Sequence, residues 1–270
     1  MEITRIRTIS ALAIFCAALP IAAVAESDEY RYTLPGSSTA VYSAGTVMVR
    51  LGGSYLEADD QKGKWRFDRV RYPFLDGLRY KISTANTWNF TAGFMPMDHF
   101  AVEVGYIGKS THDLDFQGLQ SPFAGRKIRA GDIERRSGTI MFNWFPVCTE
   151  SWVQPYVGVG FNYTDFDDVK LGRVANEYLA VVSDGIGEAK VFLDDTWGWA
   201  AQVGLDVMFG PENDWFFNAA IQYQDVEVTA DLHFAVPGVI IPKTFVHAAR
   251  TRVEFDPWIY SIGFGYKFRL

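Results

Sequence analysis

Four charged residues stand at alternating positions of segments that are otherwise apolar or small, and they are the first candidates for chemistry. Two are cations, Arg50 and Lys267, and two are anions, Glu103 and Asp206. Unpaired charges facing an enclosed interior would be costly, so we expect these four to pair. Two interpretations stay open: a structural salt-bridge network that closes the interior, and a polar constriction or gate. The gate candidates on this face are Arg50, Glu103, Gly105, Gln202, Asp206, Gln222 and Lys267.

Metal binding and nucleophilic catalysis would need histidine and serine in suitable patterns, and the chain offers few. Its histidines show no ligand spacing, so we expect no metal ion and no cofactor. No serine pairs with a histidine at the expected lipid-facing depth, which disfavours an enzyme. A serine–histidine pair within hydrogen-bond reach in the folded chain would reopen that possibility. The histidines are His99, His112, His233 and His247.

Composition and charge narrow the function classes further. The chain has 270 residues, of which 49% are hydrophobic and 16% aromatic, and its net charge is −7. This acidic balance gives no footprint for nucleic-acid binding. No apolar run of about 18 residues follows the N-terminus, so the sequence contains no ordinary transmembrane helix. The apolar residues are instead spread in alternation, as a membrane barrel requires.

The first 25 residues are typical of a secretory signal peptide. Arg5 and Arg7 precede an apolar stretch, and residues 23–25 (AVA) form a cleavage site of small residues. We expect residues 26–44 to form a periplasmic N-terminal segment and residues 45–270 to form one folded domain. The mature chain would keep one cysteine, Cys148, and therefore no internal disulfide.

The stretch 258–268 indicates which element positions the charged residues. Apolar, mostly aromatic side chains occupy one face, and small or polar ones, including Lys267, occupy the other. Such alternation is typical of a β-strand with two different faces. An aromatic terminal strand would aggregate in water but is covered in a closed barrel surrounded by lipid. This strand is therefore predicted to close a transmembrane barrel.

Seven further stretches alternate in the same way. Their connections are long, short, long, short, long, short and long, which is the plan of an outer-membrane barrel with short periplasmic turns and long extracellular loops. The sequence thus predicts an all-β fold, an eight-stranded antiparallel transmembrane β-barrel, with a helical turn near residues 176–182. The predicted strands are 45–57, 81–94, 100–106, 133–145, 152–166, 193–209, 215–228 and 258–268.

Four segments of the chain resemble one known family. They are FNWFP (residues 142–146), PYVGVGFNY (155–163), DTWGWAAQVGLDV (195–207) and DPWIYSIGFGYKF (256–268), and in this order they resemble the outer membrane protein W (OmpW) family. The resemblance implies an eight-stranded barrel in the outer membrane of a Gram-negative bacterium. It also implies contact with outer-membrane lipids and insertion by the barrel-assembly machinery, which reads a terminal aromatic residue. Here Arg269 and Leu270 follow Phe268.

The function implied by the resemblance is passive passage of small hydrophobic molecules through a narrow interior, with lateral exit into the membrane. The inward residues of this chain look small or polar, which does not match an apolar conduit. The alternative is a closed structural barrel whose loops contact lipopolysaccharide, host or phage. An open lumen would support the first function, and a lumen blocked by the charged residues would support the second.

Two loops carry unusual side chains. The segment 231–248 is rich in apolar residues and could form an entrance for apolar solutes, or a hairpin that packs against other loops. Its candidates are Phe234, Val239, Ile240, Ile241 and Phe245. A second loop carries basic residues that could bind lipopolysaccharide phosphates, or could simply be solvated. These are Arg126, Lys127, Arg129, Arg135 and Arg136.

Overall fold

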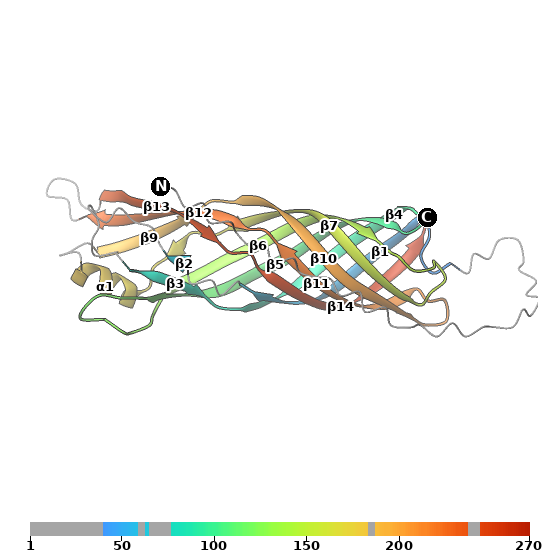
Figure 1. Cartoon of the computed structure of the whole chain (residues 1–270), viewed down its shortest axis with the longest axis horizontal. Coiled ribbons are helices and arrows are strands. Elements are labelled where there is room, and N and C mark those ends of the chain that lie inside the picture. The colour runs from blue at the N-terminus through green and yellow to red at the C-terminus, as the bar shows by residue number, and fades with distance from the viewer. Residues whose placement is uncertain (1–39, 59–62, 65–76, 183–186, 237–243) are drawn as a thin grey trace, which may run out of the picture. The chain divides into compact units, whose positions relative to one another are not determined.

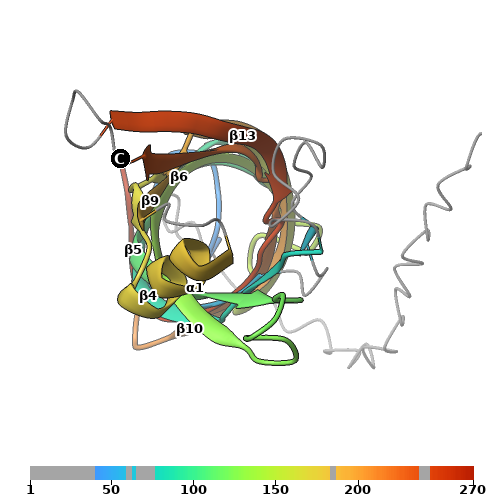
Figure 2. The ribbon, with the colours of Figure 1, turned by 90° about the vertical axis from the view of Figure 1, so that its left-hand side faces the viewer.

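Eight long antiparallel strands close into a barrel in the computed structural model, which describes residues 40–58, 63–64, 77–182, 187–236 and 244–270. β1 closes the ring against β14, from Thr46 opposite Arg269 to Glu57 opposite Trp258. The predicted closing strand is therefore confirmed. Around the ring (Figure 2) the strands are β1 (Thr46–Glu57), β4 (Ala85–Met97), β5 (Phe100–Gln117), β6 (Ile128–Trp144), β7 (Val153–Phe166), β10 (Thr196–Phe209), β11 (Trp215–Gln224) and β14 (Trp258–Arg269).

The short connections lie at one end of the barrel, called here the short-turn end, together with the C-terminus (Figure 1). The β4–β5 turn consists of Asp98 and His99, because Met97 pairs with Phe100, and His99 has a φ of 68°. The sequence predicts this turn at residues 95–98, and that prediction is wrong. The strand continues through Pro96 because the register shifts between Phe94 and Met97, an irregularity at which a strand tolerates proline.

At the opposite end, called here the long-loop end, the strands extend well beyond the predicted bounds. β5 and β6 include most of the predicted loop 109–132. A second sheet has the order β13 (Thr244–Glu254), β12 (Glu227–Val236), β9 (Gly187–Leu193), β8 (Val169–Lys170), and two short strands, β2 (Gly63–Lys64) and β3 (Arg79–Ile82), extend the barrel sheet beside β5. The predicted helical turn lies within α1 (Arg173–Val182), which crosses the opening of the ring in Figure 2.

The two ends of the barrel have opposite patterns, and β5 shows the change within one strand. Before Gly108 its exposed face is apolar, as at Val104, and its inward face carries Glu103. Beyond a register shift between Ile107 and Ser110, the outward side chains are polar, as at Lys109. The inward ones are first polar, at Ser110 and His112, and then apolar, at Leu114 and Phe116. The first part of this strand therefore has the pattern of a membrane barrel, with apolar side chains outward. The second part has the pattern of a water-soluble barrel, with polar side chains outward.

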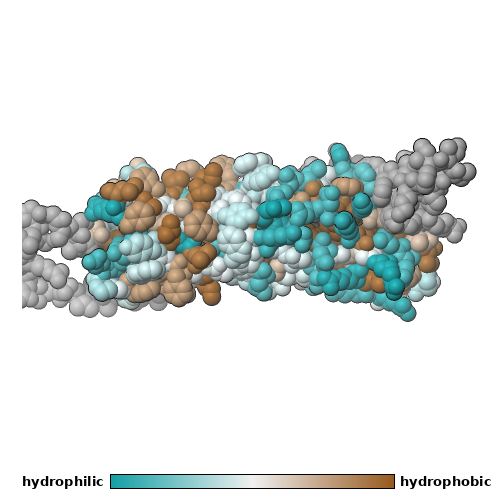
Figure 3. Space-filling view, turned by 180° about the vertical axis from the view of Figure 1, so that it is seen from behind, coloured by the Kyte–Doolittle hydropathy of each residue, from teal (hydrophilic) through white to brown (hydrophobic). Residues whose placement is uncertain are grey.

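The surface follows the same division. Figure 3 shows an apolar belt nearer the short-turn end and a mostly hydrophilic surface towards the long-loop end. Between them, exposed or half-buried tryptophan and tyrosine rings pack together, as expected at a membrane interface. No helix in the described part of the chain is long and apolar enough to span a membrane. The packed ring pairs are Trp88–Tyr106, Tyr163–Trp197, Trp199–Tyr223 and Tyr223–Trp258, with centroids 4.9–5.5 Å apart.

Two large clusters of buried apolar side chains, and a small third one of Leu56, Ile107 and Ile259, lie in the described part of the barrel. The inner core lies at the short-turn end and comprises Val41, Tyr42, Met48, Met95, Ala101, Phe145, Tyr156, Met208 and Phe216. The outer core lies at the long-loop end and includes strand residues such as Leu114, Ile133, Phe166 and Val228, together with Phe255 before β14 and Ala175, Tyr178 and Leu179 of α1. The polar residues of the lumen lie between these two cores.

Candidate functional site

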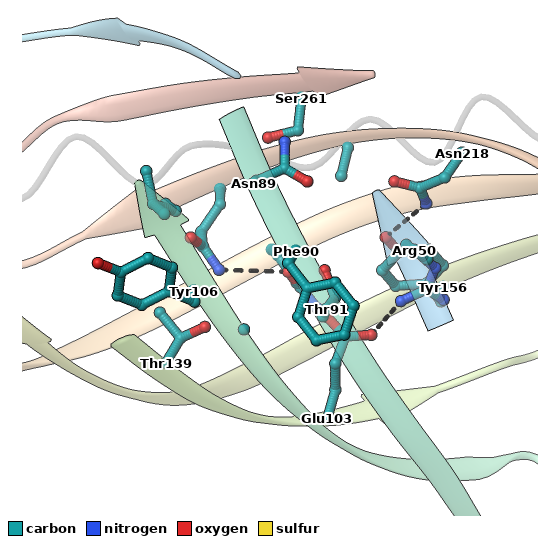
Figure 4. Close-up of a pocket in the computed structure, with 15 residues that line it drawn as sticks. Arg50, Asn89, Phe90, Thr91, Glu103, Tyr106, Thr139, Tyr156, Asn218 and Ser261 are labelled. Atoms are coloured by element: carbon teal, nitrogen blue, oxygen red, sulfur yellow. Dashed lines mark hydrogen bonds and ion pairs between the residues drawn. The ribbon is translucent and has the colours of Figure 1, made fainter. Parts of the chain in front are cut away.

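An ion-pair network crosses the lumen between three strands. Arg50 of β1 contacts Glu103 of β5 through Nη1, and its Nη2 lies 2.8 Å from Oδ2 of Asp206 on β10. All three residues are at most 5% exposed. The guanidinium also lies between the rings of Tyr156 and Phe216, 5.3 and 5.5 Å from their centroids. Figure 4 shows Arg50 reaching across to Glu103. The expected pairing of these three residues is confirmed.

Lys267 does not join this network, so its predicted pairing with these anions is wrong. In the β1–β14 register Gly265 lies opposite Arg50, and Lys267 lies opposite Met48, one inward position nearer the short-turn end. Its Nζ is 3.9 Å from Oδ1 of Asp214 in the β10–β11 turn. Alternation places a side chain on the correct face but does not give its level along the barrel axis.

Tyr42 caps the network from the short-turn end. Its hydroxyl donates to Oδ2 of Asp206 at 2.7 Å, and its ring packs edge-on against Phe145 with a centroid distance of 5.1 Å. The backbone N–H groups of Val41 and Tyr42 donate to the carbonyl oxygen of Thr149. Residues just before β1 therefore enter the barrel and close this end of the lumen. Sequence reasoning missed Tyr42 because it precedes the first alternating stretch.

A row of side-chain amides runs from Glu103 toward the long-loop end. Gln224 donates to Gln222 (3.0 Å), Gln222 to Gln202 (3.3 Å), Gln202 to Asn143 (2.7 Å), and Asn143 to Glu103 (3.1 Å). We call these four residues the amide row. Each amide donates toward the anion and accepts from the side away from it, so the four dipoles are aligned.

Glycines make room for these lumen contacts. Gly158 of β7 lies opposite both Gln202 and Asn143, and a Cβ there would lie 2.0 Å from Oδ1 of Asn143. The Gln202–Asn143 hydrogen bond can therefore cross β7 only above a glycine. Gly105 has the same role beside Thr139 and lines a cavity of about 40 Å³ that also touches Arg50 and Gln222 (Figure 4). Glu103 and Gln202 also line this cavity, so all the gate candidates except Asp206 and Lys267 meet there, and Asp206 is joined to it through Arg50.

The outer core forms a chamber of a different character. It contains a cavity of about 20 Å³ with a wholly apolar lining that includes Ile133, Phe166 and Phe255. α1 packs over it through Tyr178, whose hydroxyl accepts a hydrogen bond from the Gln120 backbone N–H at 3.2 Å. The cavity is far smaller than the roughly 150 Å³ that holds benzene in an apolar protein interior. A solute of that size could therefore enter only if the side chains that line the cavity moved apart.

The predicted apolar entrance lies partly outside the described residues, which give only the backbone of the rest. Val239, Ile240 and Ile241 lie outside the described residues. The backbone places Phe234 in β12 and Phe245 in β13, and Phe245 pairs with Ala235. The segment is thus largely a strand hairpin rather than a loop.

Arg135 is not on the surface, so its predicted place among lipopolysaccharide contacts is wrong. It points into the lumen, is 1% exposed, and donates to Oε1 of Gln224 at 3.1 Å. Its level lies beyond the apolar belt, since outward side chains nearby form ion pairs, such as Lys109 with Glu134. Burial lowers the pKa of Arg135 to about 9, so the guanidinium keeps its charge at neutral pH.

Three of the other predicted surface cations are neutralised by carboxylates. Lys127 pairs with Asp115 at 2.8 Å, and Arg129 and Arg136 each pair with two aspartates. These pairs leave little net positive charge to attract phosphate groups. Arg126 is exposed and is the fifth member of the predicted cluster.

A buried serine–histidine pair lies at the same level as Arg135. Oγ of Ser110 is 3.3 Å from Nε2 of His112, and Nδ1 of His112 is 2.7 Å from the carbonyl oxygen of Ser83. The pair is therefore within the hydrogen-bond reach that a serine nucleophile and its base would need. Burial, however, lowers the pKa of His112 to about 4, which makes it a weak base for activating a hydroxyl at neutral pH. Within the described residues no cluster of side chains could hold a metal ion.

Comparisons with known proteins agree with this geometry. Outer membrane protein W of Vibrio cholerae is 32% identical over 187 residues, covering 69% of this chain and 76% of that protein. Outer membrane protein W of Salmonella typhimurium is 34% identical over 236 residues, covering 87% of this chain and 94% of that protein. The crystal structure of OprG from Pseudomonas aeruginosa has a TM-score of 0.68 at 27% identity, covering 87% of this chain and 100% of that chain.

The family assignment also fixes where the barrel resides. A family model described as the OmpW family matches residues 43–268, which contain all eight barrel strands except Arg269, the last residue of β14. The protein is thus a barrel of the Gram-negative outer membrane, with its short turns in the periplasm and its long loops outside the cell. The chain belongs to the OmpW family.

Proposed function

We propose that this barrel admits small apolar molecules from outside the cell into its outer chamber and releases them sideways into the membrane. The observation that carries the proposal is the order of the two layers along the barrel axis, from the long-loop end to the short-turn end. A wholly apolar cavity lies above a polar layer that Arg50, Glu103 and Asp206 tie across the barrel. An apolar solute that reaches the outer chamber has no favourable path down this layer, because it would have to separate buried ion pairs.

The side wall offers a place for lateral release. β4 pairs with β5 as far as Asn89 opposite Ile107, and β3 resumes pairing with β5 at Ile82 opposite Leu114. Between these positions the ladder is replaced by isolated contacts, such as the Ser83 backbone N–H donating to the carbonyl oxygen of Asp113. The indole of Trp88 lies against Gly108 at this gap, next to the apolar belt. A gap held by a few isolated hydrogen bonds and covered by Trp88 can open at lower cost than a paired ladder.

The test measures uptake into vesicles whose outer leaflet is lipopolysaccharide. N-phenyl-1-naphthylamine, a small apolar probe that fluoresces in phospholipid, should enter several-fold faster when the barrel is present. Tyr178→Ala, which loosens α1, and Trp88→Ala, which uncovers the gap, should each speed entry further. The matched controls Val181→Ala, on the exposed face of α1, and Trp199→Ala, an equally exposed girdle residue, should not. Unchanged entry with and without the barrel would refute the proposal.

Planar-bilayer recordings address the second candidate function, a closed barrel that acts through its surface. The specific observation in its favour is that Tyr42 and the ion-pair network block the axis. Both functions predict that the barrel shows no discrete ionic conductance. A silent barrel that also fails to speed entry of the apolar probe would favour the surface function, and discrete conductance steps would contradict both.

A further inference from the structure

Arg135 is a buried cation that forms no ion pair with any described residue. Its Nε and Nη1 atoms have no hydrogen-bond partner among the described residues, and its Nη2 donates to the neutral amide of Gln224. Arg50, the other buried arginine of the lumen, contacts two carboxylates. Leaving a fully desolvated guanidinium without an anion is costly, so the vacant donors at Arg135 point to a ligand.

The described residues around it supply no anion but offer a further polar atom. Ser137, the next inward residue of β6, is 1% exposed, and its Oγ has no partner within the described chain. His112 is neutral at pH 7 and already engages Ser110 and Ser83. Arg135 and Ser137 therefore present vacant hydrogen-bonding atoms along one inward face of β6. Together they suit an oxygen-rich group with one negative charge.

The apolar cavity of the outer core lies directly beyond this cation. Ile133, the inward residue that precedes Arg135 on β6, lines the cavity, and so does Phe255. The Arg135 guanidinium carbon lies 5.1 Å from the centroid of the Phe255 ring. Arg135 itself does not line the cavity, but it packs against Phe255 and follows Ile133 on β6, so the cation lies next to a chamber whose lining is wholly apolar. A ligand that satisfies both parts must have an anionic head and an apolar tail.

We propose that the outer chamber binds an aliphatic monocarboxylate, with its carboxylate on Arg135 and its chain among the outer-core side chains. A carboxylate carries the single negative charge that matches this single cation, whereas a phosphate would bring a second charge with no partner. The cavity of about 20 Å³ favours a short chain, for which the side chains that line the cavity move apart. This inference rests on the proposed function and narrows its substrate class from apolar molecules to anionic amphiphiles.

Binding of ¹³C-carboxyl hexanoate to the full mature barrel in phospholipid nanodiscs tests the proposal, with 1-hexanol and acetate as comparison ligands and empty nanodiscs as reference. We expect saturable, carboxylate-specific binding that weakens about tenfold or more in Arg135→Met, because a charged hydrogen bond is lost. Hexanol binding should be unchanged in that variant. Arg136→Met is the matched control, since this neighbouring arginine points outward to Asp165 and Asp167, and it should bind hexanoate normally.

Several outcomes would overturn the assignment. They are hexanoate binding by Arg135→Met as tight as that of the unaltered protein, acetate binding as tight as hexanoate binding, or no saturable hexanoate binding at all. If Arg135→Met does not fold, Arg135→Gln must show the same loss. Binding of hexanol without hexanoate would refute this inference alone, whereas binding of neither, with no entry of the apolar probe into vesicles, would refute the proposed function as well.

Discussion

The inner and outer halves of this barrel are built from the same strands under opposite rules. In the inner half, lipid faces apolar side chains, and the lumen holds the ion-pair network and the amide row next to the inner core. In the outer half, water faces charged side chains, and the lumen is apolar beyond the level of Arg135 and His112. β5 changes from one rule to the other at Gly108, so a single strand serves as wall for two chambers. The same strand can therefore carry either pattern, and whether lipid or water surrounds it at a given height decides which side chains face the lumen there.

The two buried arginines are the sharpest test of this contrast. Arg50→Met leaves Glu103 and Asp206 buried with their cation removed, so we expect a loss of about 3–5 kcal/mol in the free energy of unfolding. Arg135→Met removes a cation without breaking an ion pair, so its free energy of unfolding should stay unchanged or rise. Urea unfolding of both variants in the same lipid or detergent measures the difference. Equal losses in the two variants would show that Arg135 is as well compensated as Arg50.

Acid should weaken the outer half in particular, through His112. Its pKa is lowered to about 4 in the folded chain by burial, whereas an unfolded histidine titrates near 6.5. The unfolded state therefore binds more protons between these values, and stability is present above pH 6.5 and is lost as the pH falls toward 4. The shift corresponds to about 3 kcal/mol. Unfolding measured from pH 7 to pH 4 should show this loss, and His112→Gln should flatten it. An unaltered slope in that variant would contradict the assignment.

A glycine of the inner half should tolerate no side chain. Gly158→Ala places a Cβ 2.0 Å from Oδ1 of Asn143, where the amide row crosses β7, and we expect a loss of about 1–3 kcal/mol. Gly53→Ala is the control, because the nearest atom to a Cβ there is 3.9 Å away. Unfolding midpoints of the two variants measure the difference. If Gly158→Ala were neutral, the amide row would be loosely packed.

The outer surface should give the smallest response. Lys109 bridges Glu134 and Asp167 in an exposed position, and such pairs contribute little because water and salt screen them. Lys109→Ala should therefore leave the unfolding midpoint unchanged within error, both in low salt and in 0.5 M salt (about a 4 Å screening length). A clear salt-dependent loss would mean that the outer half depends on its surface charges as the inner half depends on its buried ones.

The sequence revealed the inner half far better than the outer half, for a physical reason. Where lipid surrounds the barrel, apolar side chains alternate outward, and the aromatic face of residues 258–268 could be read directly. Beyond Gly108 the outward residues are charged, so strands such as β5 and β6 looked like solvated loops, and Arg135 was placed on the surface. Alternation predicts which face of the strand Lys267 occupies but not its position along the barrel axis. Tyr42 lies outside any alternating stretch, so no pattern marks it. Levels and non-alternating segments depend on register and packing, which a single sequence does not display.

The amide row has a direction, and it must be kept or reversed as a whole. Turning one amide alone would bring two NH₂ groups, or two carbonyl oxygens, face to face within the barrel. The row therefore has two collective orientations, and the charges at its ends select between them: Arg135 faces the carbonyl end and Glu103 the amino end. A cation and an anion on different strands are thus coupled through four neutral side chains, so exchanging the two charges would favour the reverse polarity along the whole lumen.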